Sequence, residues 1–84
     1  MKEFLVKVLV EPRPGLLDPE GQAIEQAIKQ LGLESAHDTR MGKVIAFKLH
    51  EESLSQARER AHWIGQKLLA NPVIEQFSLE VEAL

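Results

Sequence analysis

The sequence predicts an α+β domain, a four-stranded antiparallel sheet with both helices on one face. Three observations lead to this fold class. The apolar residues change several times between a period of two and a period of three to four. Proline, glycine or asparagine stands near most of these changes. The resulting order is strand–helix–strand–strand–helix–strand, and 84 residues leave room for a single domain, residues 1–84, with a small core.

The first strand is predicted over residues 3–10, where β-branched and aromatic residues alternate with others. Leu5 and Leu9 make the second face of this strand partly apolar as well, which is typical of a central or covered strand. The residues predicted to share its core face are Phe4, Val6, Val8 and Val10.

The first helix is predicted over residues 19–31, after a loop at 11–17 that contains two prolines and a glycine. Asp18 can accept hydrogen bonds from the free N–H groups of the first turn, and Pro19 is suited to the first helical position. Gly32 favours a left-handed stop directly after the helix.

A hairpin is predicted next, with a weak, exposed strand at 34–41 and a stronger strand at 43–50. Met41 and Gly42 between them can supply the positive φ of a tight turn.

The second helix is predicted from residue 54 to about residue 70, with Ser53 as its N-cap and Gln56 three residues later. Asn71-Pro72 ends that helix, and the last strand follows at 73–82. Two such half-units form a split βαβ, or ferredoxin-like, sheet. Because the second sheet face is partly apolar, we expect the domain to associate through its sheet.

Composition excludes several function classes. The chain has no cysteine, so neither a disulfide nor a thiolate nucleophile is available. Its net charge of −3 is the wrong sign for binding a phosphate backbone, and no apolar run is long enough to span a membrane or serve as a signal peptide. We therefore expect a cytoplasmic domain that does not bind nucleic acid and that gains stability from a partner subunit.

Catalytic signatures are sparse. The three histidines are not at metal-ligand spacing, and no nucleophile or phosphate-loop motif occurs. Arg40 and Lys43 flank Met41-Gly42 and form the best candidate site for a phosphate or a partner's carboxylate, although solubilising charges on a hairpin explain them as well. Trp63 lies beside the core stripe and either covers the margin of the core or anchors a partner.

Three separated stretches, residues 15–21, 40–43 and 67–75, go beyond periodicity. Their sequences are Gly-Leu-Leu-Asp-Pro-Glu-Gly, Arg-Met-Gly-Lys and Lys-Leu-Leu-Ala-Asn-Pro-Val-Ile-Glu. In this order and spacing they resemble the PurS family, the small subunit of bacterial and archaeal phosphoribosylformylglycinamidine synthase. Leu17 replaces the usual valine, and the loop before it carries two prolines.

This resemblance implies a non-catalytic assembly subunit in purine synthesis. It implies a homodimer or a dimer of dimers that bridges a glutaminase subunit and a large synthetase subunit and supports ammonia transfer. No cofactor is expected in this chain, whereas ATP and Mg²⁺ are expected on the large subunit. The candidate partner-binding residues are those of the three stretches: Asp18, Gly21, Arg40, Gly42, Lys43, Asn71, Pro72 and Glu75.

Two alternatives from other function classes share the predicted sheet. One is a regulatory small-molecule-binding domain of the amino-acid-sensing type, which is normally fused to an enzyme. The other is an acylphosphatase-like hydrolase, which needs an arginine cradle after the first strand and an asparagine on a later strand. Arg13 lies in the required loop but between two prolines, and Asn71 lies at a helix end.

Overall fold

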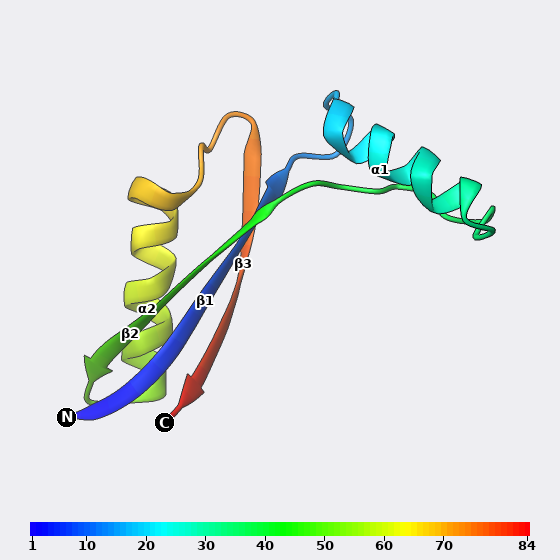
Figure 1. Cartoon of the computed structure of the whole chain (residues 1–84). Coiled ribbons are helices and arrows are strands. Elements are labelled where there is room, and N and C mark those ends of the chain that lie inside the picture. The colour runs from blue at the N-terminus through cyan, green and yellow to red at the C-terminus, as the bar shows by residue number, and fades with distance from the viewer.

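The computed structural model describes all residues, 1–84, and shows an elongated molecule. Its principal extents are 50 × 28 × 15 Å and its radius of gyration is 16.0 Å. A compact chain of this length has a radius of about 12 Å. Figure 1 shows the reason: a helix extends beyond one end of the sheet instead of lying on it. We call residues 13–42 the arm and the remaining residues the body.

The body contains a three-stranded antiparallel sheet in the order β2-β1-β3. Its strands are β1 (Lys2–Pro12), β2 (Lys43–Glu51) and β3 (Glu75–Ala83). Central Val6 stands opposite Phe47 and Val81, so one face of all three strands is apolar. The predicted first and last strands and the strand at 43–50 are confirmed.

One helix, α2 (Leu54–Ile64), covers this apolar face and continues as a π-helix at Gly65–Leu69. Ser53 caps it as predicted, because its hydroxyl oxygen accepts from the Gln56 N–H at 3.2 Å. A Cβ on Gly65 would lie 2.7 Å from the Phe77 ring, so glycine permits the close approach of the helix to β3. The buried apolar side chains of the body come from β1, from α2 and from the end of the π-helix: Phe4, Val6, Val8, Val10, Ala57, Ala61 and Ala70.

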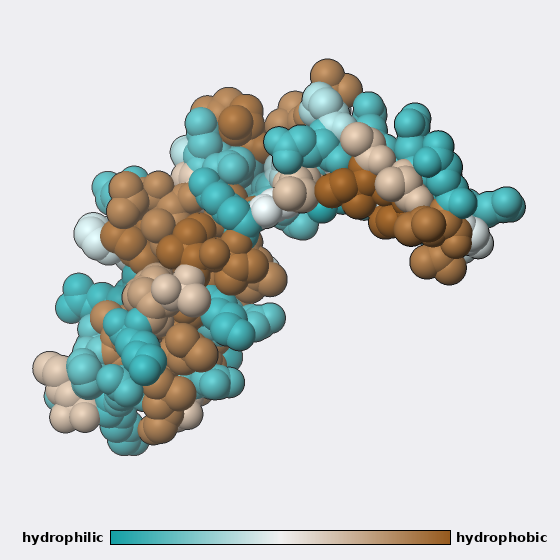
Figure 2. Space-filling model, viewed as in Figure 1, coloured by the Kyte–Doolittle hydropathy of each residue, from teal (hydrophilic) through white to brown (hydrophobic).

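The arm contains α1 (Pro19–Gln30), which begins and ends close to the predicted residues. Asp18 caps it, and Gly32 adopts φ +108°, the left-handed conformation expected of the helix stop. No apolar side chain of α1 is fully buried; Ile24 is 39% and the adjoining Leu31 is 88% exposed. Figure 2 shows this apolar strip along the lower side of the arm.

The predicted hairpin is wrong, because its first strand, at 34–41, does not form and the sheet has three strands instead of four. The prediction that both helices cover the sheet is also wrong. Residues 34–42 contain no strand, and β2 pairs directly with β1 after the excursion of the arm. Most of that segment is polar, so a strand there would bury little apolar surface. Its backbone is bound to α1 instead, through Thr39 and Met41. The three strands keep the order that the split βαβ fold gives its first, third and fourth strands.

Candidate partner-binding surface

The eight predicted partner-binding residues fall into two clusters. The first, the arm base, lies where the arm joins the body and comprises Asp18, Gly21, Arg40, Gly42 and Lys43. The second, the corner, follows the π-helix and comprises Asn71, Pro72 and Glu75.

Asp18 joins the two chain segments of the arm base. Its Oδ1 accepts from the Gly21 N–H and its Oδ2 from the Met41 N–H, both at 2.9 Å. The Met41 bond, followed by the Gly21 bond and the charge of Arg40, lowers the pKa of Asp18 below its ordinary value. The carboxylate therefore caps α1 and holds the returning chain against it.

The two glycines of the arm base allow close backbone packing within the chain. A Cβ on Gly21 would lie 2.6 Å from the Thr39 carbonyl oxygen, so the near neighbour is the chain's own later loop. A Cβ on Gly42 would overlap the Val10 carbonyl oxygen. Gly42 does not have a positive φ, so the expected tight turn is corrected to a close approach between the ends of β1 and β2.

Arg40 and Lys43 lie at the junction of arm and body, not at the tip of a hairpin. Arg40 is half-buried, and its Nη1 is 3.5 Å from the Leu16 carbonyl oxygen. Lys43 is exposed, opens β2 opposite Val10, and makes no ion pair. Neither cation forms an ion pair within the chain.

The corner is closed by reciprocal hydrogen bonds. Glu75 Oε1 accepts from the Asn71 N–H at 2.7 Å, and the Glu75 N–H donates to the Asn71 carbonyl at 2.8 Å. Asn71 Oδ1 also accepts from the Val73 N–H at 3.0 Å. These bonds hold the turn between the π-helix and the start of β3.

Arg13 links the corner to the start of the arm, and sequence reasoning missed this role. Its Nε and Nη2 donate to the Pro72 carbonyl oxygen at 3.1 and 2.8 Å. The Arg13 N–H also donates to the Ile74 carbonyl at 2.9 Å. A guanidinium used in this way does not form the phosphate cradle that an acylphosphatase-like site needs. The feature of the sequence that could have indicated this role is the position of Arg13 between two prolines.

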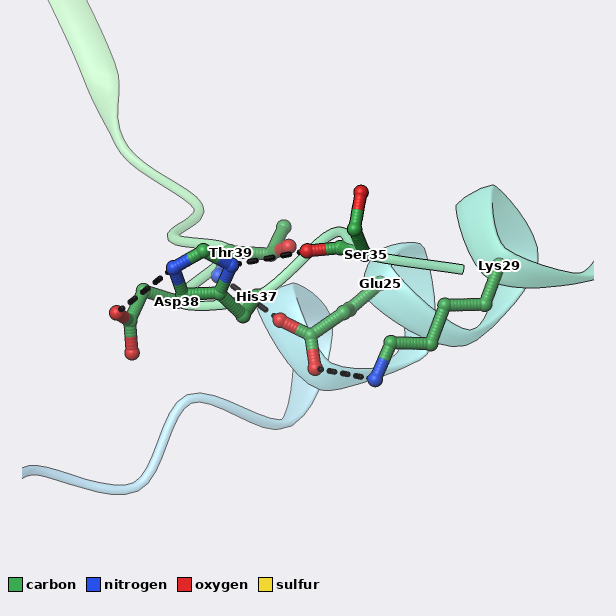
Figure 3. A network of polar contacts seen from close by, with 6 residues as sticks. All are labelled: Glu25, Lys29, Ser35, His37, Asp38 and Thr39. Atoms are coloured by element: carbon green, nitrogen blue, oxygen red, sulfur yellow. Dashed lines mark hydrogen bonds and ion pairs between the residues drawn. The ribbon is translucent and has the colours of Figure 1, made fainter. Parts of the chain in front are cut away.

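A polar network fixes the return loop on α1 (Figure 3). Glu25 Oε1 accepts from the Thr39 N–H at 3.1 Å, and Glu25 Oε2 lies 3.8 Å from the Lys29 ammonium. The bonds from Thr39 lower the pKa of Glu25, and the charges of Lys29 and His37 act in the same direction. His37 Nδ1 lies 2.9 Å from the Ser35 carbonyl oxygen. Helix and return loop therefore form one unit.

The three histidines lie in three different places. His37 lies 3.9 Å from Asp38 on the arm, His50 lies 3.3 Å from Glu3 at the other end of the sheet, and His62 lies against the Phe77 ring. They do not form a shared site. None of the helices is both long and apolar enough to cross a membrane.

An apolar groove of about 280 Å³ lies between α2 and the edge strand β2. Trp63, the single tryptophan of the chain, is 54% exposed in it. Its other lining residues are Phe47, Leu49, Ile64 and, at the rim, Glu51 and Arg60.

Comparison with known proteins decides the family. The family model described as "PurS: Phosphoribosylformylglycinamidine (FGAM) synthase" matches residues 5–83. The chain belongs to the PurS family. The PurS subunit of Mycobacterium leprae is 39% identical over 83 residues, which cover 99% of each chain.

Solved PurS structures share the fold. The PurS of Thermus thermophilus gives a TM-score of 0.86 at 38% identity over 98% of each chain. A chain in the structure of PurLQS from Thermotoga maritima gives 0.80 at 30% identity over all of both chains. The chain is thus a subunit of phosphoribosylformylglycinamidine synthase, an enzyme of purine biosynthesis.

Proposed function

We propose that this PurS chain assembles the synthase by bridging its glutaminase and large synthetase subunits, supports ammonia transfer between them, and catalyses no step alone. The single observation that supports this most is its full-length likeness to a chain of the Thermotoga maritima PurLQS complex. The chemistry stays with the partners: glutamine hydrolysis on the glutaminase, and ATP and Mg²⁺ on the synthetase. The complex works in the cytoplasm.

A homodimer, or a dimer of dimers, is part of the proposal. The largest buried cluster of the chain has only five members, three valines and two alanines. Large apolar side chains such as Leu17, Leu31 and Leu68 are each more than 70% exposed. A second copy offers the burial that so small a core lacks.

The arm base is the proposed docking surface for the large subunit. Arg40 and Lys43 place two positive charges in a chain whose net charge is −3. Hydrogen bonds from charged groups contribute roughly 1.5–3 kcal/mol each when partners desolvate them. Arg13, where the chain enters the arm, donates to the Pro72 carbonyl of the corner, and a hydrogen bond between Asn71 and Glu75 closes that corner. We therefore expect the corner to orient the arm base.

Reconstitution with purified synthetase and glutaminase subunits tests the proposal. Glutamine-dependent activity should require this chain, which alone should hydrolyse neither glutamine nor ATP. The double variant Arg40→Ala/Lys43→Ala should weaken complex formation about tenfold or more, since about 1.4 kcal/mol corresponds to tenfold.

The matched control removes two lysines from the open sheet face, Lys7→Ala/Lys48→Ala, and should bind as the wild type does. Activity that does not depend on this chain would contradict the assembly role. Equal binding by both double variants would instead remove the arm base from the docking surface.

A further inference from the structure

A pocket of about 210 Å³, the corner pocket, lies where the π-helix, the start of β3 and the first residue of the arm meet. Figure 1 shows these three segments at one end of the sheet. Ala70, Pro72 and Phe77 supply its apolar surface. The polar side chains that line it are Arg13, His62, Gln66, Glu75 and Gln76. Apolar surface combined with several convergent polar groups is typical of a site for a small molecule.

Arg13 is held rigidly at this pocket. Its Nε and Nη2 donate to the Pro72 carbonyl oxygen at 3.1 and 2.8 Å, and its backbone N–H donates to the Ile74 carbonyl at 2.9 Å. The side-chain bonds use one edge of the guanidinium and leave the Nη1 end and one N–H of Nη2 free. Arg13 also forms no ion pair. The pocket therefore carries a fixed, positively charged fork whose free edge matches a carboxylate.

Two acceptor oxygens in the same pocket are also unused. Glu75 accepts from the Asn71 N–H through Oε1, and Gln76 donates to Glu11 through Nε2 at 2.8 Å. Glu75 Oε2 and Gln76 Oε1 accept no hydrogen bond within the chain, and Glu75 forms no ion pair. One cation and one carboxylate thus line the pocket without neutralising each other. This combination matches a small zwitterion, which has an ammonium and a carboxylate of its own.

The remaining polar side chains can recognise an uncharged polar group. Gln66 and His62 form no hydrogen bond within the chain. The Gln66 amide offers both a donor and an acceptor, which is the complement of another amide. The His62 ring lies 5.4 Å from the Phe77 ring and has both of its nitrogens free. A ligand with a carboxamide group would satisfy these side chains.

The volume of the pocket limits the size of the ligand. About 210 Å³ is the space of roughly seven waters at about 30 Å³ each. Sites for drug-sized molecules are larger, about 300–1,000 Å³. A ligand on the order of ten non-hydrogen atoms fits this volume, because bonded atoms lie closer together than separate waters.

We propose that the corner pocket binds a free α-amino acid with a carboxamide side chain. Arg13 holds the α-carboxylate, the free oxygens of Glu75 and Gln76 accept from the ammonium, and Gln66 pairs with the side-chain amide. The site goes beyond the assembly role and does not depend on it. Because the ligand contacts the start of the arm, the π-helix and β3, its binding stabilises the corner.

A nuclear magnetic resonance titration of the isotope-labelled full chain with L-glutamine tests the site. We expect saturable shifts at the Arg13 Nε–H, the Gln66 side-chain amide and the Phe77 backbone amide, with half-saturation on the order of 1 mM for so small a ligand. Glutaramate lacks the amino group and L-glutaminamide lacks the free carboxylate, so each should bind about tenfold more weakly or worse. Equal binding of glutaramate would overturn the zwitterion site. No shifts, shifts that do not saturate, or shifts confined to other surfaces would overturn it as well.

Two variants of the pocket separate ligand binding from a structural role of Arg13. Arg13→Lys keeps the charge but lacks the planar fork, and should weaken binding about tenfold or more. Gln66→Ala removes an exposed side chain that has no bond within the chain, and should weaken binding about fivefold with the fold unchanged. The matched controls, Arg58→Lys and Gln56→Ala, are exposed on α2 outside the pocket and should bind as the wild type does. Unchanged binding in Gln66→Ala would overturn the site, whatever the effect of Arg13→Lys.

Discussion

The body and the arm are stabilised by different interactions. In the body, four side chains of β1 are at most 2% exposed beneath α2, between strands far away in the sequence. In the arm, the only buried residue is Gly21, and the segment is held by its caps and by hydrogen bonds to Asp18 and Glu25. Caps and nearby hydrogen bonds are therefore enough to form the helix of the arm and its return loop. The position of that helix relative to the sheet depends instead on the surface against which it packs.

The largest expected effect comes from the core of the body. Phe4→Ala should lower the free energy of unfolding by about 3–5 kcal/mol, because Phe4 is 1% exposed and its removal leaves a cavity. The matched change in the arm, Gln22→Ala, removes an exposed polar side chain of α1 and should cost less than about 0.5 kcal/mol. Urea unfolding followed by circular dichroism measures both. Similar losses would remove the distinction between body and arm.

The sequence predicts most of the body and the helix of the arm. Alternation in β1 and the caps at Asp18 and Ser53 are local signals, and the structure confirms each. The position of α1 was not predictable in this way, because an apolar stripe on a helix does not indicate which surface covers it. The strand at 34–41 was predicted from a weak signal in mostly polar residues and from a tight turn at Met41-Gly42, and the structure has neither the strand nor the turn.

The sequence singles out the motif residues but does not predict the geometry in which they meet. The motif residues do gather at the arm base and the corner, but Arg40 and Lys43 mark a junction and not a hairpin tip. Gly42 shows why: a glycine between two segments fits both a positive φ and a close approach, and only the position of the Val10 carbonyl separates the two.

The junction itself should be sensitive to a single methyl group. Gly42→Ala should cost about 1–3 kcal/mol of unfolding free energy, since its Cβ would overlap the Val10 carbonyl and the backbone would have to shift. Met41→Ala, one residue earlier and 43% exposed, is the control and should cost much less. The same urea experiment compares them. If Gly42→Ala is as stable as the control, the close approach of Gly42 to β1 contributes little to stability and the prediction is wrong.

A smaller effect is expected at the start of α2. Ser53→Ala removes the hydroxyl that accepts from Gln56 and should cost about 1 kcal/mol, the usual value for an N-cap. Ser55→Ala, on the exposed first turn of the same helix, is the control and should change stability little. Thermal unfolding of the two variants measures the difference. If Ser53→Ala behaves like this control, packing alone determines where α2 begins.

The smallest effect is confined to the arm and depends on pH. Asp18 and Glu25 both have lowered pKa values in the folded chain, chiefly through bonds from Met41 and from Thr39. The arm's extra stability is therefore fully present above their unfolded values, about 3.9 and 4.3, and is lost as pH falls through the folded values. Amide hydrogen exchange should accelerate at Thr39 and Met41 in that window before it does in β1. Asp18→Asn/Glu25→Gln should abolish this selective pH dependence. Simultaneous loss of protection in arm and body would mean that the carboxylates stabilise the whole fold and that the arm is not an independent unit.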